Sequence, residues 1–483
     1  MTSLKNTENK QNKNIMKKKL LIFLILQLIG LSLNAQTNSN ETNETEINSE
    51  LHSNDAQHRC ITEVEYQSLE VEITKNQKIL GLDKAINNTA SVTLLSWPLR
   101  PSANLDDCSY YRISAYVDQN TTTGTFSDFN CGSNTYDGHK GTDISIWPFN
   151  FYKMDNNLVE VIAAASGTIV AKHDGEFDRN CAATTALANY LVIKHADGSL
   201  TNYWHMKNGS LTSKIVGDAI TVGEYVGVVG SSGSSSGPHL HFEVWSGSTN
   251  ATRVDPYSGT CNLLNGSTWW ANQKAYKETG VIKVSSNSTD AVFPGCPTTE
   301  TPNESNSFTI PYQGVGLPAG YAKFYMFIRD EVSGLNANLS ILNPNGSTYL
   351  AWTYNSTTTI GSKTMAYSKV LPSSPGIYTF QATYNGTSCS STFTIVNSLG
   401  ISELNNQSLV GVYPNPTENK INVKVDAILL GSIYTLYDNN GKSVLSGKIN
   451  SENTVIELDN LSGGIYLFSV GENLRQTFKL IKE

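Results

Sequence analysis

Short strand-like runs separated by turn residues are the feature that most constrains the fold of this sequence. Between residues 142 and 245 the runs are rich in β-branched and aromatic side chains, and Gly, Asn and Asp separate them. Many short strands with such turn signals between them predict an antiparallel all-β domain, which we place at residues 96–262. The runs are Thr142–Ile146, Val159–Ala164, Gly167–His173, Tyr190–His195, Leu200–His205, Tyr225–Val229 and His239–Trp245.

Two further β domains follow in the sequence. Alternating runs between Phe308 and Val396 predict an immunoglobulin-like β-sandwich over residues 308–397, which we interpret as a binding or spacer module. Residues 263–307, before it, are expected to be a tail followed by a linker rich in Thr, Pro and Asn. Residues 409–483 contain a hairpin-turn signal and predict a small C-terminal β-sandwich. The expected fold class is therefore mainly β.

The N-terminus has the pattern of a secretory signal. Lys17, Lys18 and Lys19 precede the apolar run Leu20–Leu33, and Ala35 offers a small residue for cleavage, so residues 1–35 predict an N-terminal extension and signal peptide. The run is too short to span a bilayer comfortably, and no membrane span is expected in the mature protein. Residues 36–95 begin with a polar stretch that predicts disorder. From Cys60 onward they are either a prosegment that folds on the next domain or a simple linker.

Charge and cysteine content narrow the possible functions. The formal net charge is −8, and no cluster of Lys and Arg lies outside the N-terminus, so a nucleic-acid partner is not expected. In an exported protein the seven cysteines are expected to pair, with six forming three disulfides and one left over. The sequence does not choose among the possible connectivities.

The strand-like run that starts at His239 is the clearest candidate for chemistry. Alternate side chains leave a strand on opposite faces, so His239, His241 and Glu243 share one face. Two adjacent imidazoles just after a Ser- and Gly-rich loop predict a reactive site. Glu243 is either a hydrogen-bond partner of a ligand histidine or a solvated surface residue. The other face is expected to be core and carries Leu240, Phe242 and Val244.

Two other segments supply matching side chains. A Gly-rich loop carries His139 and Asp143, and its glycines allow the bends that bring an imidazole and a carboxylate together. On a further run, strand alternation predicts that Tyr203 and His205 share a face. Paired with the His-x-His strand, whose two histidines could both bind one metal, His139 and Asp143 predict three donors and an open fourth position, as a catalytic zinc site requires. Ordinary structural roles are expected for the remaining strand histidines, His173 and His195.

These motifs, in this order, resemble the signature of the lysostaphin and β-lytic zinc metallopeptidases. The resemblance covers roughly residues 97–256. It implies one Zn²⁺ per chain, held by His139, Asp143 and His241. It also implies two catalytic imidazoles, His205 and His239, with Tyr203 assisting. Since this family cleaves peptidoglycan, the resemblance implies a metallo-endopeptidase that hydrolyses peptide bonds in the stem peptides or cross-bridges of cell walls.

The C-terminal region resembles the sorting domain of the type IX secretion system. The features that carry this resemblance are Val412–Pro416, the strand-like Gly464–Leu467 and the basic residues near the end. The resemblance implies type IX secretion machinery as a partner and a secreted location, either extracellular or on the outer cell surface.

Other interpretations of the sequence stay open. A catalytically inactive relative could act as a cell-wall binding or regulatory module, an adhesin-like protein could rely on its C-terminal sandwiches, and an active enzyme could instead cleave glycine-rich extracellular protein. The leftover cysteine raises a further hypothesis. In a prosegment, Cys60 could occupy the open zinc position until the segment is removed; the alternatives are a merely reactive thiol or an ordinary disulfide.

Overall fold

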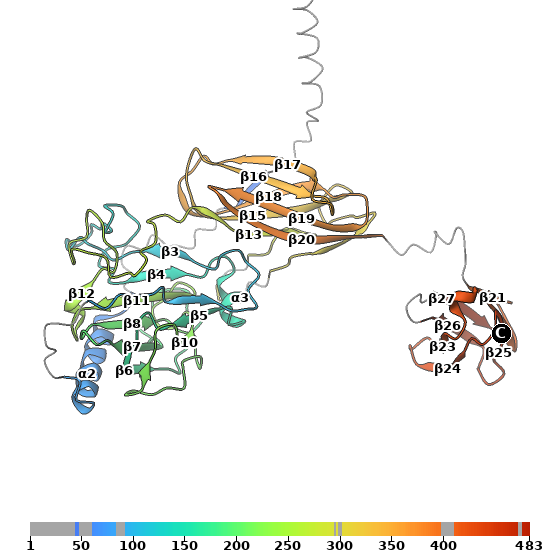
Figure 1. Ribbon diagram of the computed structural model, residues 1–483, viewed down its shortest axis with the longest axis horizontal. Coiled ribbons are helices and arrows are strands. Elements are labelled where there is room, and N and C mark those ends of the chain that lie inside the picture. The colour runs from blue at the N-terminus through green and yellow to red at the C-terminus, as the bar shows by residue number, and fades with distance from the viewer. Residues whose placement is uncertain are drawn as a thin grey trace, which may run out of the picture. The chain divides into compact units, whose positions relative to one another are not determined.

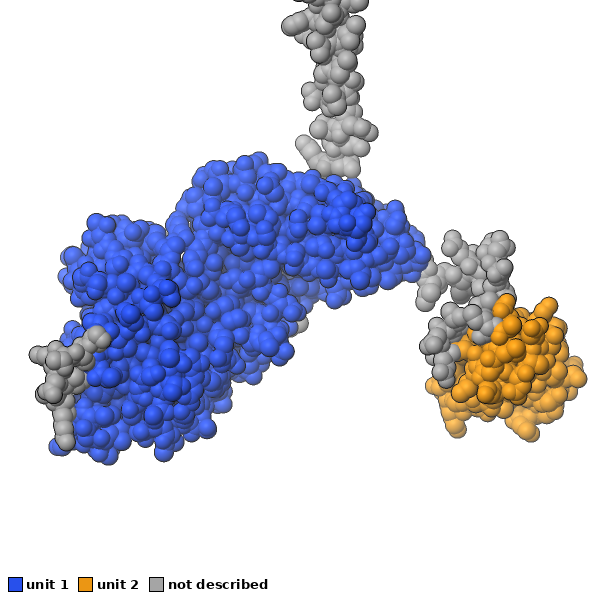
Figure 2. Space-filling model, in the orientation of Figure 1, with its two compact units in different colours: residues 1–397 blue, residues 398–483 orange. Residues whose placement is uncertain are grey.

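The computed structural model describes residues 44–47, 60–83, 92–293, 296–297, 302–397, 410–471 and 476–483. They belong to two compact units, residues 1–397 and residues 398–483, which we describe separately (Figure 2). Antiparallel strands dominate both units, which confirms the mainly β fold class (Figure 1). The predicted signal peptide, residues 1–35, lies outside the described residues. No helix in the described ranges is long and apolar enough to cross a membrane.

A large antiparallel sheet organises the first unit. Its strand order is β3-β4-β11-β8-β7-β6-β9, and β12 pairs with β11. All seven runs predicted between residues 142 and 245 are strands, and two of them, β6 and β11, have the predicted bounds. The strands are β3 Arg112–Ala115, β4 Thr142–Ser145, β6 Gly167–His173, β7 Tyr190–Lys194, β8 Leu200–Trp204, β9 Ala219–Ile220, β11 His239–Trp245 and β12 Arg253–Val254.

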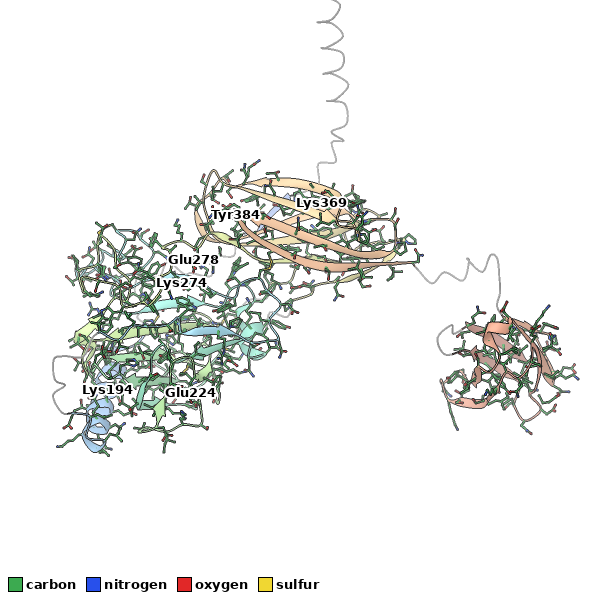
Figure 3. All side chains as sticks on the ribbon, in the orientation of Figure 1. Lys194, Glu224, Lys274, Glu278, Lys369 and Tyr384 are labelled. Atoms are coloured by element: carbon green, nitrogen blue, oxygen red, sulfur yellow. A yellow bond between two sulfur atoms is a disulfide. The ribbon has the colours of Figure 1, made fainter. Side chains whose placement is uncertain are left out.

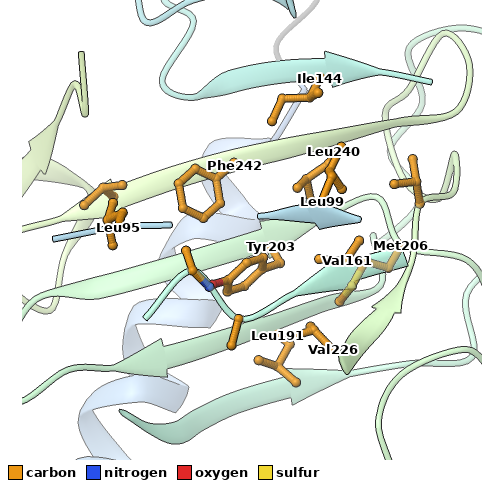
Figure 4. Close-up of a cluster of buried hydrophobic side chains, with 14 of the residues drawn as sticks. Leu95, Leu99, Ile144, Val161, Leu191, Tyr203, Met206, Val226, Leu240 and Phe242 are labelled. Carbon is orange, nitrogen blue, oxygen red and sulfur yellow. The ribbon is translucent and has the colours of Figure 1, made fainter. Parts of the chain in front are cut away.

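A smaller sheet covers one face of the large sheet. It consists of β10 Tyr225–Val228, β5 Val159–Ile162 and β2 Leu99–Pro101. Leu240 and Phe242 of β11 lie in one buried cluster with Leu99 and Val161 of the smaller sheet (Figure 4). Because alternate residues of β11 enter this core, the other set of β11 side chains faces the opposite side of the sheet. The predicted core face of the His239 strand is thereby confirmed.

Helix α2, Glu63–Ile79, covers the opposite face of the large sheet. Its first turn is closed by a capping box, in which Thr62 accepts from the Glu65 amide and Glu65 accepts from the Thr62 amide. Ile73 and Leu69 pack in a buried cluster with side chains of β6, β7, β8 and β11. Lys194 of β7, near α2 in Figure 3, donates to Gln77 Oε1 at 3.1 Å. The interpretation of this stretch as a simple linker is therefore wrong, because it folds on the sheet.

The second half of this unit is a sandwich of two sheets around one buried cluster. The sheet orders are β1-β18-β15-β13 and β14-β20-β19-β16-β17. Residues 263–307 are not only tail and linker, since β13 lies within them and pairs with β15. β1 lies in the stretch predicted to be disordered. The strands are β1 Glu44–Ile47, β13 Gly280–Asn287, β14 Ser307–Ile310, β15 Tyr321–Glu331, β16 Asn336–Leu342, β17 Thr348–Asn355, β18 Ile360–Val370, β19 Gly376–Tyr384 and β20 Thr387–Asn397.

The sandwich is fixed to the first half of the unit. A disulfide joins Cys108 to Cys389 of β20. Trp147 and Phe149, which precede the short helix α3 Asn150–Asp155, share a buried cluster with Phe327 of β15. The sandwich is therefore part of one compact unit with the large sheet rather than a module on a free linker.

Two more disulfides complete the expected set of three. They join Cys131 to Cys261 and Cys181 to Cys296. The leftover cysteine is Cys60, which is not in a disulfide and lies just before α2. The alternative in which Cys60 forms an ordinary disulfide is therefore excluded.

The second unit is a small β-sandwich, as predicted for residues 409–483. One sheet has the order β21-β22-β25 and the other β24-β23-β26-β27, and a buried cluster lies between them. The Asp438–Gly441 turn connects β23 to β24. The strands are β21 Val410–Tyr413, β22 Lys420–Val425, β23 Ile433–Tyr437, β24 Ser443–Lys448, β25 Asn453–Glu457, β26 Gly464–Val470 and β27 Gln476–Lys482.

Candidate metal centre

The three predicted zinc ligands converge at the large sheet. β11 pairs with β4 so that His241 lies directly opposite Asp143, and His139 comes from the loop before β4. Asp143 Oδ1 lies 2.7 Å from His241 Nδ1, and Asp143 Oδ2 lies 3.2 Å from His139 Nε2. The two ring nitrogens are 3.2 Å apart. A side chain at Gly141 would clash with this arrangement, because its Cβ would lie 2.7 Å from the His241 ring.

Hydrogen bonds on the far side of each ring determine which nitrogen faces the centre. His139 Nδ1 lies 2.6 Å from the Tyr116 carbonyl oxygen, which can only accept a hydrogen bond. His241 Nε2 lies 2.8 Å from the Glu243 carboxylate. Both rings therefore use one N–H away from the centre, and in the neutral tautomers the nitrogens that face Asp143 carry lone pairs.

This donor set fits a zinc ion. In the neutral tautomers two nitrogen lone pairs and a carboxylate point at one another, and such acceptors repel unless a proton or a metal cation lies between them. Imidazole nitrogens and carboxylate oxygens are zinc ligands, and a tetrahedral site with bonds of 2.0–2.1 Å places neighbouring ligand atoms about 3.3 Å apart. The observed separations of 2.7 and 3.2 Å approach that spacing.

His205 and His239 border the same space. Residue His205 follows the last residue of β8 with a φ of 63°, which turns its ring toward His239, at 4.7 Å between ring centroids. His205 Nδ1 lies 2.6 Å from the Ser232 carbonyl oxygen, and His239 Nδ1 lies 2.8 Å from the Gly237 carbonyl oxygen. Their Nε2 atoms are buried and have no hydrogen-bond partner in the described parts of the chain. His239 Nε2 lies 3.6 Å from Asp143 Oδ1, beyond hydrogen-bond distance. Both rings therefore present a ring nitrogen without a hydrogen bond beside the three convergent donors.

Tyr203 does not lie in this site. It is fully buried in the core between the two sheets, where its hydroxyl accepts from the Ala164 amide at 2.8 Å (Figure 4). Its hydroxyl also accepts from Thr201 at 3.1 Å. The prediction that it shares a face with His205 is wrong, because β8 ends at Trp204 and the positive φ of His205 breaks the alternation.

Glu243 is buried beneath the centre and is not a solvated surface residue. Its exposed fraction is 1%. One oxygen accepts from His241, and the other accepts from Trp245 Nε1 at 2.7 Å. The Tyr66 hydroxyl of α2 also donates to it. The alternative in which Glu243 orients a ligand histidine is the one that these contacts support.

Tyr136, which sequence reasoning missed, and Cys60, which it placed at the open position as a hypothesis, complete the surroundings. The Tyr136 ring stacks on His139, and its hydroxyl lies 3.5 Å from Asp143 Oδ2. The Cys60 sulfur lies 2.7 Å from the Tyr136 hydroxyl and 3.9 Å from Asp143 Oδ2. No motif spacing includes Tyr136. Its position three residues before His139 was the signal that could have suggested it.

The electrostatics of the site favour positive charge. Burial lowers the pKa of His139, but the Asp143 carboxylate outweighs burial and raises it to about 9. Burial raises the pKa of Asp143, and the surrounding imidazoles, His139 first, hold it well below its usual value. A buried carboxylate that stays ionised requires a cation nearby, which a metal ion supplies when bound.

The remaining strand histidines have ordinary partners outside the centre. His173 lies 2.7 Å from Glu176 and is half-buried. His195 is held between the Ser166 carbonyl oxygen and the Thr201 hydroxyl, at 2.9 and 3.0 Å. The expectation of structural roles for both agrees with these contacts.

Comparisons with known proteins match the two regions that carry the sequence motifs. The family described as Peptidase family M23 matches residues 138–256, and the family described as Secretion system C-terminal sorting domain matches residues 411–483. The cell division protein DipM of Caulobacter vibrioides is 34% identical over 99 residues, which are 20% of this chain and 16% of that protein. The DD-carboxypeptidase/endopeptidase Mpg of Neisseria meningitidis is 41% identical over 70 residues, 14% of this chain and 15% of that protein. The chain thus spans about a sixth of these curated relatives.

Solved structures are also similar to part of the chain. The catalytic domain of lysostaphin from Staphylococcus simulans is 25% identical, with a TM-score of 0.21 and coverage of 30% of this chain and 89% of that one. The catalytic domain of the M23 protein EnpA from Enterococcus faecalis is 23% identical, with a TM-score of 0.19. The match covers 34% of this chain and 96% of that one. From the family matches and the motifs within them, the chain carries a lysostaphin-like domain of peptidase family M23 followed by a secretion system C-terminal sorting domain.

Proposed function

We propose that this protein is a secreted zinc metallo-endopeptidase that hydrolyses peptide bonds in peptidoglycan. The observation that carries the proposal is the convergence of three metal donors with two imidazole nitrogens that make no hydrogen bond to the described residues, in one buried space. The M23 domain and the name of the Neisseria relative, a DD-carboxypeptidase/endopeptidase, support the same reaction class.

His139, Asp143 and His241 are the residues that would hold one zinc ion. Their mutual distances and ring orientations fit it, and Glu243 keeps the His241 ring in the orientation that presents Nδ1. When bound, zinc acts as a Lewis acid toward the scissile carbonyl and acidifies the attacking water.

His205 and His239 are the proposed proton carriers. Each ring is fixed by a backbone carbonyl at Nδ1, so that Nε2 alone is free to accept a proton from the attacking water. The protonated ring can then return that proton to the leaving amine. Because the two rings lie beside each other, one can act as base while the other acts as acid.

Tyr136 replaces Tyr203 as the proposed hydroxyl of the site. Its hydroxyl faces the same space as the ligands, within 3.5 Å of Asp143 Oδ2. A phenol donor in that position can stabilise the negative oxygen that develops on the substrate carbonyl. Tyr203 instead serves the core, and burial raises its pKa to about 12.

Peptidoglycan is favoured over the alternative substrates by the arrangement of the whole chain. The C-terminal sorting domain supports export by the type IX machinery to the outer surface or the medium, where cell walls are accessible. A catalytically inactive relative is disfavoured, because all five proposed zinc and imidazole positions are filled by suitable side chains. A glycine-rich extracellular protein remains the alternative substrate, and the experiment below includes it.

The test measures bound zinc per chain and amine groups released from purified peptidoglycan or from a glycine-rich protein. We expect the wild-type chain to bind one zinc ion. After limited proteolysis of the chain, we also expect it to release amine groups from peptidoglycan. Both the zinc and the release are expected to be lost in His139→Ala. His173→Ala is the matched control, because it removes a half-buried histidine outside the site and is expected to change neither. A wild-type chain that binds no zinc would overturn the proposal, and release from the glycine-rich protein alone would change the substrate.

A further inference from the structure

Cys60 stands out because it is the only one of the seven cysteines outside a disulfide. Its sulfur points into the metal centre. The sulfur, His139, Asp143 and His241 each offer a donor atom, and these atoms all lie within 4.8 Å of one another. The sulfur therefore occupies the side of the centre that the three proposed ligands leave open.

A second observation points to the same space. The Nε2 atoms of His205 and His239 are buried and have no hydrogen-bond partner in the described residues. The Cys60 sulfur lies within 4.8 Å of donor atoms of both rings. The thiol thus stands where the attacking water and the substrate carbonyl would have to lie between the imidazoles and the metal.

We propose that the Cys60 thiolate is the fourth ligand of the zinc ion and that residues 60–82 are a built-in inhibitor of this site. The inference rests on the proposed zinc centre. Four protein ligands make a closed tetrahedral site, whereas a catalytic site keeps one position open. On binding, the thiol gives its proton to solvent and the sulfur forms the bond to zinc, so that no oxidant or reductant is required.

The segment that carries Cys60 is held firmly in place. In α2, Asn76 donates to the Val170 carbonyl oxygen of β6 at 2.9 Å. Glu72 accepts from the Tyr190 hydroxyl at 2.6 Å, and the Tyr66 hydroxyl donates to Glu243 beneath the centre. The helix therefore contacts both the sheet and the residue that orients His241.

The docked segment leaves no room for a substrate. Cys60, Ile61 and Tyr66 of the segment line the remaining cavity together with residues of the domain that include Tyr136 and His139. The cavity has a volume of about 10 Å³, which leaves room for little more than a water molecule. A peptide strand cannot enter such a space, so the segment has to leave before hydrolysis can begin.

Cobalt substitution tests the sulfur–metal bond without relying on activity. The full chain is loaded with Co²⁺ in wild-type form and as Cys60→Ser. We expect one cobalt per chain in both, and a sulfur-to-cobalt charge-transfer absorption in the near ultraviolet only in the wild type. Cobalt bound without that absorption would overturn the inference and leave the proposed function intact. No cobalt bound in either form would instead contradict the proposed metal centre.

A pair of helix variants tests the inhibitory role of the segment. Ile73→Asp places a charge at a fully buried position of α2, whereas Val71→Asp does so at a position that is 69% exposed. We expect Ile73→Asp to lose the charge-transfer absorption, to keep one metal per chain, and to release amine groups from peptidoglycan at least about tenfold faster than wild type, as for a closed form favoured by about 1.4 kcal/mol. Val71→Asp is expected to behave as wild type. Equal rates and equal spectra in the two variants would overturn the inhibitory role.

Discussion

At the scale of single residues, Tyr203 shows how a motif residue can serve the core instead of the reaction. Its hydroxyl accepts from the buried Ala164 amide, which belongs to the segment after β5. In this position the tyrosine joins the two sheets on the face away from the metal centre.

We expect Tyr203→Phe to lower stability rather than to remove the reaction. The substitution leaves the Ala164 amide without its partner, at a cost of about 1–3 kcal/mol. Urea unfolding of the variant and zinc content per chain measure the two effects, and zinc content is expected to stay at the wild-type value. A variant of unchanged stability with a large loss of peptide hydrolysis would contradict this assignment.

Asp255 gives a pH dependence that arises mainly from its own burial, although the charge of nearby His139 opposes the shift. Burial raises the pKa of Asp255 to about 7, although the Tyr257 amide and Gln119 donate to it. The folded state therefore binds the proton more tightly than the unfolded state, and the free energy of unfolding falls as the pH rises from the unfolded value near 3.8 to about 7. At 1.36 kcal/mol per pH unit, the loss from this group is on the order of 4 kcal/mol.

Asp255→Asn is expected to remove this contribution to the slope of the free energy of unfolding against pH. The measurement is the urea unfolding free energy of wild type and variant at pH 5 and pH 8. Because the amide also changes the hydrogen bond with Gln119, the slopes are compared and not the absolute values. Parallel slopes in the two proteins would show that Asp255 does not titrate in this range.

At the scale of elements, much of the first domain could be predicted from its sequence. The period of two in His239–Trp245 predicted both the core face and the site face, because a strand with one face buried has its register set by that pattern. The register of β11 against β4, which brings Asp143 to His241, could not be predicted, since it depends on long-range pairing.

Helix α2 was the element that sequence reasoning interpreted least well. Its buried residues Tyr66, Leu69 and Ile73 have helical spacing, but exposed Val64 and Val71 interrupt the pattern. The capping-box sequence from Thr62 to Glu65 was a usable signal for its start.

We expect Thr62→Ala to loosen α2. Loss of the cap costs about 1 kcal/mol of helix stability. Amide hydrogen exchange of residues 63–79 is expected to become faster, and alkylation of Cys60 in the metal-free protein is expected to become faster with it. Thr74→Ala, at an exposed position within the helix, is the matched control and is expected to slow exchange slightly, because alanine favours the helix. Identical exchange in both variants would mean that packing alone holds the helix.

At the scale of the whole molecule, long-range connections were beyond the sequence. The composition of residues 297–307 indicated a linker, yet β13 precedes that stretch and joins the sandwich, and Cys108 bonds to Cys389 across a separation of 281 residues. Alternating patterns show that strands exist, but they do not show which sheet each strand enters.

The Cys108–Cys389 disulfide is expected to stabilise the first unit and to leave the metal centre unchanged. In the double variant Cys108→Ser, Cys389→Ser, the unit is expected to lose about 2–5 kcal/mol, because the unfolded chain regains the freedom of a long loop. Calorimetry measures the change in Tm, and the amount of zinc bound per chain shows whether the proposed metal centre is intact. An unchanged Tm would show that the other contacts, among them the apolar cluster around Phe327 and the Lys283–Asp107 ion pair, are enough to hold the sandwich in place.

The position of Cys60 on the same chain as the proposed metal ligands would also determine how inhibition by this segment responds to dilution. A separate inhibitor dissociates when a secreted protein spreads into a large volume, but a tethered segment keeps the same local concentration however far the protein travels. Cutting the backbone between α2 and β2 would turn the segment into a separate peptide. The fraction of sites that this peptide occupies would then fall as the protein is diluted. Activation by such a cut would therefore be irreversible in a large volume, and it would be slow in a small volume, where the released peptide stays concentrated.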